Sequence, residues 1–390
     1  MSLESGQAGT IMSKHQAGPA HVAYLDSVRG LAALTVIGSH YVNSYDLPCR
    51  SDFCNRLLSD FPLHVFWDGA AAVSLFFVLS GLVLSLRHFR HGAAPDLSRF
   101  HLGEYFIMRV CRIWLPYLAV LCLSAVLYRH YQAVSGGWPA TIPKQNEWLP
   151  SLWGRPAGWG EFFQDSFLLG MRKEMVYVPQ AWTLCIELAL SLLVPVGVMV
   201  AARSSLWLAL FTLFAIHPLG VSPALLHFML GILLAKHHGR LAPWLAGQVY
   251  ARRGLALLGF LLYTIGETQG DRIDADLLGG LTGLGAGLLL LYAFASARLQ
   301  RVLSYSGFRY VGKVSYSIYL IHFAVLVNAT PGFLAWLDAS PSGLVPAWWG
   351  GLLAVILTSV VCAAFSYRFI EVPSMALGKR LGRWIRAWGV

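Results

Sequence analysis

A few ionisable side chains lie inside long apolar stretches of this chain, and these are the residues that could do chemistry. His40 lies in AYLDSVRGLAALTVIGSHY and Glu187 in QAWTLCIELALSLLVP. An ionisable side chain within a membrane-spanning helix is energetically costly, so each one is a candidate for function. An imidazole also titrates in the range that suits a general base near neutral pH. His40 is therefore a candidate catalytic base.

His40 and Glu187 are predicted to lie at a similar depth in the membrane. Arg29 marks the inner end of the first span, and the helical rise places His40 about 16 Å above it. Glu187 lies about 9 Å below the outer end of its own helix. We therefore expect Glu187 to fix the tautomer of His40 and to stabilise its imidazolium. Two simpler readings stay open: a buried structural histidine, and an ion pair of Glu187 with an arginine.

Arg109 and Arg112, in EYFIMRVCRIWLP, are three residues apart and share one face of a helix. Two guanidinium groups on one face suit a phosphate-bearing ligand. The same residues would also serve as ordinary positive charges that anchor the inner end of a span. Asp26 is expected to pair with Arg29, or Arg29 to point into the same cavity.

Polar residues recur at i, i+4 and i+7 along KVSYSIYLIHFAVL, at Ser315, Tyr319 and His322. A polar stripe that faced lipid would be costly, so it should face a protein-lined, partly wet cavity. His322 is the main alternative to His40 as the catalytic histidine.

Ser80, in SLFFVLSGLVL, precedes Gly81, and small residues at such a place often serve close helix packing.

The composition of the chain predicts that these residues lie in a membrane-embedded helical domain. The chain has 390 residues, 56% hydrophobic and 12% charged, whereas soluble domains carry about 25% charged residues. This composition argues against a soluble enzyme and excludes a disordered protein. Windows of roughly 20 apolar residues predict an all-α, polytopic helical bundle of about ten transmembrane helices. The predicted spans are 28–45, 69–86, 110–129, 181–200, 204–219, 222–236, 254–268, 277–296, 314–330 and 347–367.

The net charge of +10 is distributed by topology. With the N-terminus inside, 21 Lys and Arg residues fall in inner segments and 8 in outer ones. This bias predicts that both termini are cytoplasmic and that the number of spans is even. It does not indicate a nucleic-acid partner. We expect a flexible tail over 1–22, a membrane domain over 23–373 and a basic cytoplasmic tail over 374–390.

The long outer loop over 131–180 is rich in tryptophan. Indoles favour the membrane interface whatever the function, although they could instead stack on sugar rings. The four residues are Trp138, Trp148, Trp153 and Trp159.

Cys49 and Cys54, in the first outer loop, could form a disulfide in an oxidising compartment. No His/Cys cluster has metal-ligand spacing, so no metal is expected.

Six segments together resemble the membrane-embedded acyltransferase type 3 family, from Tyr24 to about Pro373. In the family's order they are LDSVRGLAALTVIGSH, FFVLSG, RVCRIWLP, WTLCIE, SYSIYLIH and YRFIEVP. The resemblance implies an enzyme of the bacterial cytoplasmic (inner) membrane that moves an acyl group, usually acetyl, from cytoplasmic acyl-CoA to a hydroxyl on the outer side. Acceptors in the family are mostly sugars of polysaccharides, or of their lipid-linked oligosaccharide precursors.

The resemblance also implies roles for individual residues. His40 matches the family's essential histidine, which we expect to deprotonate a hydroxyl that attacks the thioester directly. Glu187 matches the carboxylate of the W-[ST]-L-x-x-E motif and is expected to orient His40. In the R-x-x-R element, Val110 replaces the usual aromatic residue, a change that touches packing more than charge. Arg109 and Arg112 match this element, which the family is thought to use towards CoA. Apart from the resemblance, we expect the acetyl-CoA site to include Arg29, Ser80, Ser315, Tyr319 and His322 as well, with Ser80, Tyr319 or Ser315 as an oxyanion donor.

Other functional classes stay open at this point. A transporter of a sugar or organic anion would also use a helical bundle with buried polar groups, although common transporter folds show inverted repeats that are not evident here. A structural partner in glycan synthesis would need none of the intramembrane ionisable residues. The acceptor hydroxyl, the acyl chain length and the oligomeric state do not follow from the sequence.

Overall fold

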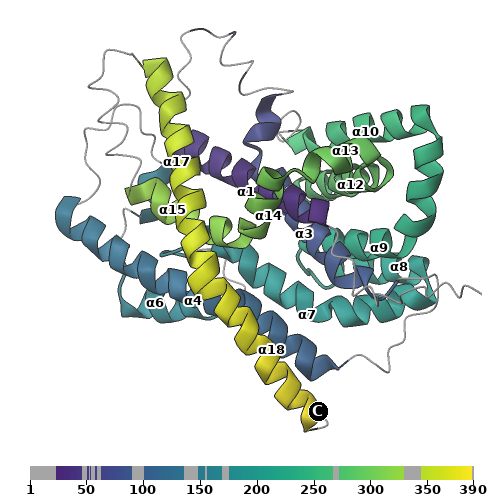
Figure 1. Cartoon of the computed structure of the whole chain (residues 1–390), viewed down its shortest axis with the longest axis horizontal. Coiled ribbons are helices and arrows are strands. Elements are labelled where there is room, and N and C mark those ends of the chain that lie inside the picture. Colours follow the sequence, from purple (N-terminus) through teal and green to yellow (C-terminus); the bar gives the residue numbers. More distant parts are fainter. Residues whose placement is uncertain are drawn as a thin grey trace, which may run out of the picture.

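The computed structural model describes residues 23–45, 51, 53, 58, 63–89, 101–135, 148–153, 156–168, 175–266, 272–328 and 344–388. Every secondary-structure element in these ranges is helical, as predicted (Figure 1). The elements are α1 (Ala23–Ser44), η1 (Leu63–Phe66), α3 (Gly69–Leu86), α4 (Leu102–Ser135), α5 (Trp148–Trp153), α6 (Trp159–Ser166), η5 (Pro179–Ala181), α7 (Trp182–Arg203), α8 (Ser205–Ile216), α9 (Ala224–Gly247), α10 (Val249–Tyr263), α12 (Ala275–Ala295), α13 (Ala297–Leu303), α14 (Ser306–Lys313), α15 (Ser315–Asn328), α17 (Leu344–Ser366), the π-helical turn η6 (Tyr367–Glu371) and α18 (Val372–Ala387). The predicted tail over 1–22 and the pair Cys49 and Cys54 lie outside the described residues.

Each of the ten predicted spans coincides with a helix, but fewer are long and apolar enough to cross a bilayer. Within the described ranges five helices meet that test, or six if α14 and α15, which are bent by 71°, form one broken span. The five are α3, α4, α7, α12 and the rod made by α17 and α18. By contrast α8 has 12 residues, about 18 Å against a hydrocarbon core of roughly 30 Å. The total of ten and the inner location of the termini stay predictions.

Helix α3 lies at the centre of the bundle, where it packs against α1, α7, α9 and α12. At its crossing with α9, a methyl group on Gly81 would overlap the main chain of Phe228. Gly30 and Gly312 bring α1 and α14 equally close. Without a hydrophobic driving force between helices in lipid, such small residues allow the close packing that holds a membrane bundle together. Gly81 thus makes the close helix packing that was predicted for the small residues at this point of the chain.

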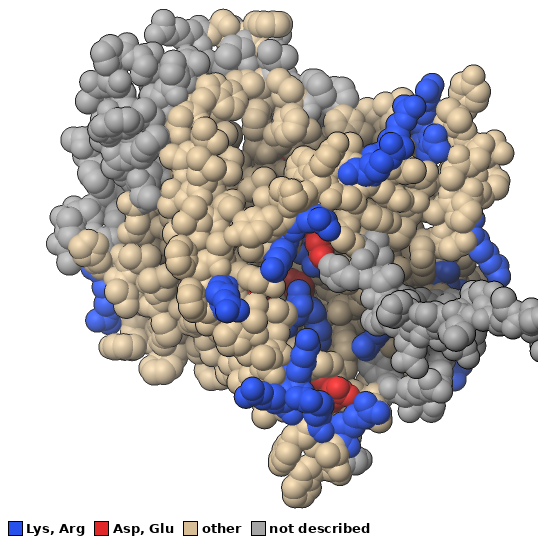
Figure 2. Space-filling model, in the orientation of Figure 1, with Lys and Arg blue, Asp and Glu red and all other residues tan. Residues whose placement is uncertain are grey.

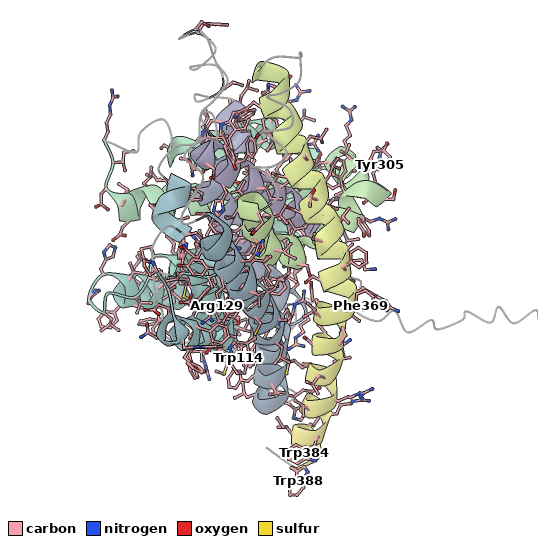
Figure 3. All side chains as sticks on the ribbon, turned by 90° about the vertical axis from the view of Figure 1, so that its left-hand side faces the viewer. Trp114, Arg129, Tyr305, Phe369, Trp384 and Trp388 are labelled. Carbon is pink, nitrogen blue, oxygen red and sulfur yellow. The ribbon has the colours of Figure 1, made fainter. Side chains whose placement is uncertain are left out.

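Helices α17 and α18 continue one another through the π-helical turn as one rod, in which α18 packs along α4 and α17 packs against α15 (Figures 1 and 3). The segment predicted as a tail from residue 374 is therefore helical as far as Ala387, and Trp384 and Trp388 are exposed at its end (Figure 3). π-Helical turns are frequent at functional sites. The last residue of this one, Glu371, is only 2% exposed and faces inward.

Large apolar side chains cover the outward faces of α8, α10 and α17. They include Leu206, Trp207, Leu210, Phe211, Leu257, Leu261, Leu353, Leu357, Val361 and Phe365. Water-facing surfaces rarely carry contiguous apolar areas of this extent, whereas lipid tails would cover them. Basic side chains run from the middle of the face in Figure 2 to its lower end, over α18. The bundle has the surface of a membrane protein.

Candidate active site

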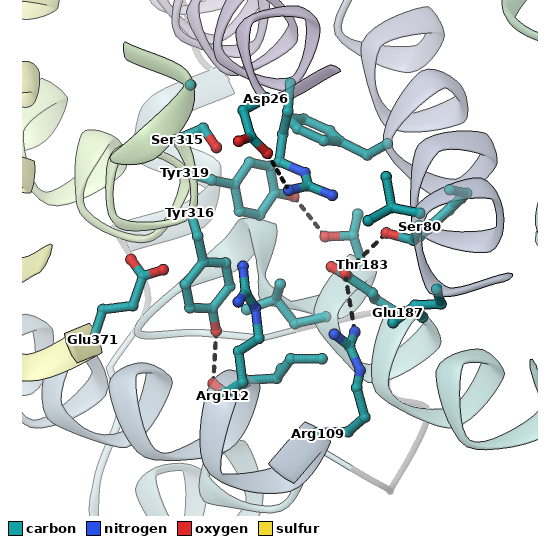
Figure 4. A pocket seen from close by; sticks show the side chains of 18 of the residues that line it. Asp26, Ser80, Arg109, Arg112, Thr183, Glu187, Ser315, Tyr316, Tyr319 and Glu371 are labelled. Atoms are coloured by element: carbon teal, nitrogen blue, oxygen red, sulfur yellow. Dashed lines mark hydrogen bonds and ion pairs between the residues drawn. The ribbon is translucent and has the colours of Figure 1, made fainter. Parts of the chain in front are cut away.

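A cavity of about 540 Å³ lies among α1, α3, α4, α7, α15 and the π-helical turn (Figure 4). We call it the charged cavity, because four basic and three acidic side chains line it. These are Arg29, Arg109, Arg112 and Lys313, with Asp26, Glu187 and Glu371. The two arginines of α4 share this cavity as their spacing predicts. Arg29, from α1, lines the same cavity.

Two of the three carboxylates neutralise arginines. Asp26 Oδ1 lies 3.6 Å from Arg29 Nη1, which confirms the predicted pair. Glu187 Oε1 lies 3.6 Å from Arg109 Nη2 and accepts a hydrogen bond from Ser80 Oγ at 3.1 Å. Glu187 therefore makes an ion pair with an arginine, which is the simpler of the two readings of this residue.

Arg112 differs from Arg29 and Arg109 in that no ion pair is found for it among the described residues. Its Nη1 lies 3.3 Å from the sulfur of Met375. Within the described part of the chain, no carboxylate lies within 4.0 Å of its guanidinium. Because a guanidinium fork binds phosphate oxygens in a bidentate manner, Arg112 is the group best placed to receive an anionic ligand.

The side of the charged cavity that α14, α15 and the π-helical turn form contains residues that were not predicted as site residues. Glu371 Oε2 accepts a hydrogen bond from Ser317 Oγ at 2.8 Å. The hydroxyl of Tyr316 donates to the Ile113 carbonyl at 2.6 Å, and the Lys313 ammonium lies 5.2 Å from the centre of the Tyr367 ring. The last predicted span ended at residue 367, which left Glu371 outside the membrane. The segment YRFIEVP was the available signal for it.

A second cavity, of about 400 Å³, adjoins the first. We call it the histidine cavity, because His40 and His227 line it together with Trp148, Gln180 and Trp182. The two cavities have four lining residues in common: Val73, Phe77, Thr183 and Tyr319. These four side chains form the boundary across which the contents of the two cavities would meet.

His40 is paired with His322. The Nε2 atom of His322 lies 3.0 Å from Nδ1 of His40. On its other side, Nδ1 of His322 lies 2.9 Å from the Tyr319 carbonyl oxygen and 3.3 Å from that of Ile318. A carbonyl oxygen only accepts hydrogen bonds, so Nδ1 of His322 carries the proton. A neutral His322 then accepts from Nδ1–H of His40, and Nε2 of His40 keeps its lone pair. The two candidate histidines thus form one hydrogen-bonded unit.

Glu187 and His40 have different partners in the structure. The contacts of Glu187 are with Ser80 and Arg109 in the charged cavity, whereas the polar partner of His40 is His322. Among the described residues, no hydrogen bond or ion pair joins Glu187 and His40. The helical rise predicts only the depth of each residue, whereas the contact between two helices also depends on their rotation about their own axes.

The polar stripe on α15 connects the two cavities. Ser315 lines the charged cavity, Tyr319 lies at the shared boundary, and His322 contacts His40 beside the histidine cavity. The hydroxyl of Tyr319 lies 2.5 Å from Thr183 Oγ1 and donates to the Gln180 carbonyl at 3.1 Å. As expected, the stripe faces a protein-lined cavity, while the opposite side of α15 packs in the core.

The tryptophans of the outer loop occupy different environments. Trp159 is 64% exposed, with the Arg129 guanidinium 4.9 Å from its ring centre, as suits the membrane interface. Trp153 is buried in the core. The Trp148 ring lies 5.1 Å from the His40 ring and lines the histidine cavity. Trp138 lies outside the described residues. Trp159 therefore fits a place at the membrane interface, whereas Trp148 lines a cavity that a ligand could enter.

No group of three or more His, Cys, Asp or Glu side chains in the described part of the chain is arranged to hold a metal ion. The four described cysteines, Cys111, Cys122, Cys185 and Cys362, are free thiols.

Comparison with known proteins gives two kinds of match. The model of an acyltransferase domain matches residues 22–367. The exopolysaccharide production protein ExoZ of Rhizobium meliloti is 27% identical over 325 residues, which cover 81% of this chain and 92% of that protein. The peptidoglycan O-acetyltransferase OatA of Listeria monocytogenes is 23% identical over 388 residues, which cover 90% of this chain but 56% of that protein. No solved structure matches the chain at a significant level.

Proposed function

The chain belongs to the acyltransferase type 3 family, and on that premise we propose that it transfers an acyl group, most simply acetyl, from cytoplasmic acyl-CoA to a hydroxyl of an extracytoplasmic glycan. The names of its relatives, one in exopolysaccharide production and one in peptidoglycan O-acetylation, favour a glycan acceptor. The observation that carries the proposal is the meeting of the two cavities, since a transferase must bring donor and acceptor together from opposite sides of one reacting centre.

Acyl-CoA fits the chemistry of the charged cavity. Its nucleotide end carries phosphates, which the guanidinium groups of Arg112, Arg109 and Arg29 would bind. Its pantetheine arm is narrow, so it could extend past Ser80 and Ser315 towards the boundary at Tyr319. The thioester would then reach the histidine cavity while the nucleotide stays on the cytoplasmic side of the inner membrane.

His40 is the proposed general base. Its Nε2 accepts the proton of the acceptor hydroxyl while the hydroxyl oxygen attacks the thioester carbonyl carbon. The tetrahedral intermediate then expels the CoA thiolate as the carbon–sulfur bond breaks, and the imidazolium of His40 returns the proton to the sulfur. The products are an O-acyl ester and free CoA. The hydroxyls of Tyr319 and Thr183 lie at the boundary and both bond the Gln180 carbonyl. To stabilise the oxyanion, one of them would turn its single proton from that carbonyl to the substrate.

We assign the orientation of His40 to His322, because His322 lies within hydrogen-bond distance of it. A base whose second ring nitrogen is held by an acceptor keeps the correct tautomer for proton abstraction. Glu187, the orienting group expected from the sequence, is proposed instead to hold Arg109 in place for the donor, with help from Ser80.

The test uses purified protein in lipid vesicles with acetyl-CoA labelled in the acetyl group. The acceptor is extracellular polysaccharide from the producing bacterium, stripped of its esters with mild alkali. We expect alkali-labile label on the polysaccharide, with release of one CoA for each ester. Uptake of unmodified sugar without ester formation would instead support a transporter. Absence of both activities would favour a structural role in glycan synthesis.

A further inference from the structure

Two buried hydrogen-bond acceptors, on residues that line the histidine cavity, lack a donor among the described residues. They are Nδ1 of His227 and Oε1 of Gln180, and neither finds a partner within the described part of the chain. The two residues are 5% and 3% exposed. Buried polar atoms are nearly always hydrogen-bonded, so each such exception in a cavity points to a missing ligand. Both residues line the histidine cavity.

The identity of each free atom is fixed by the contacts of the same side chain. His227 Nε2 lies 2.9 Å from the Gly279 carbonyl oxygen, which only accepts, so Nε2 carries the proton and Nδ1 the lone pair. The amide nitrogen of Gln180 donates to the carbonyls of Tyr319 and Leu320 at 3.1 and 3.0 Å, which leaves the amide oxygen free. Both free atoms are therefore acceptors and not donors.

The surrounding helices hold the His227 ring in place. Phe77 stacks against it with an angle of 27° between the rings. Helix α12 crosses α9 at this point, and a methyl group on Gly283 would overlap the imidazole. The ring is thus confined between an aromatic face and a glycine. A side chain held this rigidly can select a ligand by the position of its hydrogen-bond donors.

We propose that His227 and Gln180 are specificity-determining residues that accept hydrogen bonds from two hydroxyls of a carbohydrate acceptor. The inference rests on the proposed function. A sugar carries several hydroxyl groups that can donate hydrogen bonds. Trp148 and Trp182 line the same cavity, and an indole ring can pack against the C–H groups of a sugar. An acceptor with a single hydroxyl could satisfy the base His40 but neither of these two atoms.

The experiment uses two substitutions of His227 to distinguish the role of Nδ1 from that of Nε2. In His227→Gln the amide can still donate to the Gly279 carbonyl from the Nε2 position, but the Nδ1 acceptor is lost. In His227→Asn an amide oxygen replaces that acceptor. Purified variants in lipid nanodiscs are assayed with labelled acetyl-CoA and the alkali-treated polysaccharide. His237→Gln is the matched control, since His237 lies on the same helix outside both cavities.

We expect His227→Gln to raise the KM for polysaccharide about tenfold, in line with the loss of one buried hydrogen bond. The KM for acetyl-CoA should stay within twofold of the wild-type value. His227→Asn should recover most of the acceptor affinity, and Gln180→Met should repeat the effect of His227→Gln. A wild-type KM for polysaccharide in His227→Gln, or an equal rise in both KM values, would overturn the inference and leave the proposed function intact. A wild-type protein without transfer activity would overturn both.

Discussion

Nε2 of His322 lies 3.0 Å from Nδ1 of His40, and the other nitrogen of His322 is bonded to the carbonyl of Tyr319, one turn earlier on the same helix. This chain of contacts gives each imidazole a defined tautomer. It places the free lone pair on Nε2 of His40. The arrangement resembles a catalytic triad in its logic, with the neutral imidazole of His322 in the place of the usual carboxylate and the Tyr319 carbonyl fixing the tautomer of His322.

The first prediction concerns the acceptor that His322 offers to His40. His322→Leu removes it, and we expect kcat to fall by about 10²–10⁴-fold, as for other losses of the group that fixes a base's tautomer. His322→Gln keeps an oxygen near the Nε2 position and should retain more activity than His322→Leu. The KM for acetyl-CoA should not change in either variant. Equal activities of the two variants would contradict the role of His322 as the orienting group.

The second prediction concerns the donor. Arg112→Ala should raise the KM for acetyl-CoA by about 10–100-fold, because a hydrogen bond to a charged group contributes about 1.5–3 kcal/mol. Arg112→Lys keeps the charge but not the bidentate fork, so an intermediate KM is expected. Steady-state kinetics at fixed polysaccharide concentration would measure both. An unchanged KM in Arg112→Ala would reduce this arginine to a charge that sets membrane orientation.

The third prediction separates two readings of Glu187. If Glu187 serves Arg109, then Glu187→Gln should leave kcat within about threefold of the wild-type value, since the Coulomb interaction of a carboxylate with a base beyond its hydrogen-bond reach is modest. If it oriented His40 as the sequence suggested, kcat should fall by orders of magnitude and its dependence on pH should change. A pH profile of kcat for this one variant decides between them.

The fourth prediction concerns stability. Gly81→Ala places a methyl group against the main chain of Phe228, and such overpacking costs about 1–3 kcal/mol. We expect a lower melting temperature in detergent and less protein in the membrane. Gly287→Ala, on α12 with open space around it, is the matched control and should behave as wild type. Equal melting temperatures would show that α3 and α9 can separate without loss of stability.

Much of the frame could be predicted from the sequence. Each of the ten apolar windows coincides with a helix of the structure, because a segment that is buried in lipid is apolar along its whole length. Spacing along one helix placed Arg109 and Arg112 in one cavity, and it predicted the stripe from Ser315 to His322. Each of these predictions depends on a single helix, where the period of 3.6 residues determines which side chains share a face.

Contacts between different helices could not be predicted from the spacing of residues along one helix. His40 and Glu187 were matched by depth, yet the rotation of α7 turns Glu187 towards Arg109. His227 and Gln180 were not singled out, because a histidine or glutamine near the end of an apolar segment looks the same whether its second polar atom is bonded or free. Glu371 was missed because a π-helical turn continues the helix past the last apolar window.

The most direct test of the account is the activity of His40→Ala with labelled acetyl-CoA and alkali-treated polysaccharide. Equilibrium binding of acetyl-CoA is measured on the same preparation, which shows that the charged cavity is intact. We predict that ester formation falls by at least about 10²–10⁴-fold, the contribution of a positioned general base, while acetyl-CoA binds with wild-type affinity. Ester formation at the wild-type rate, with equal amounts of folded protein, would contradict the central role of His40.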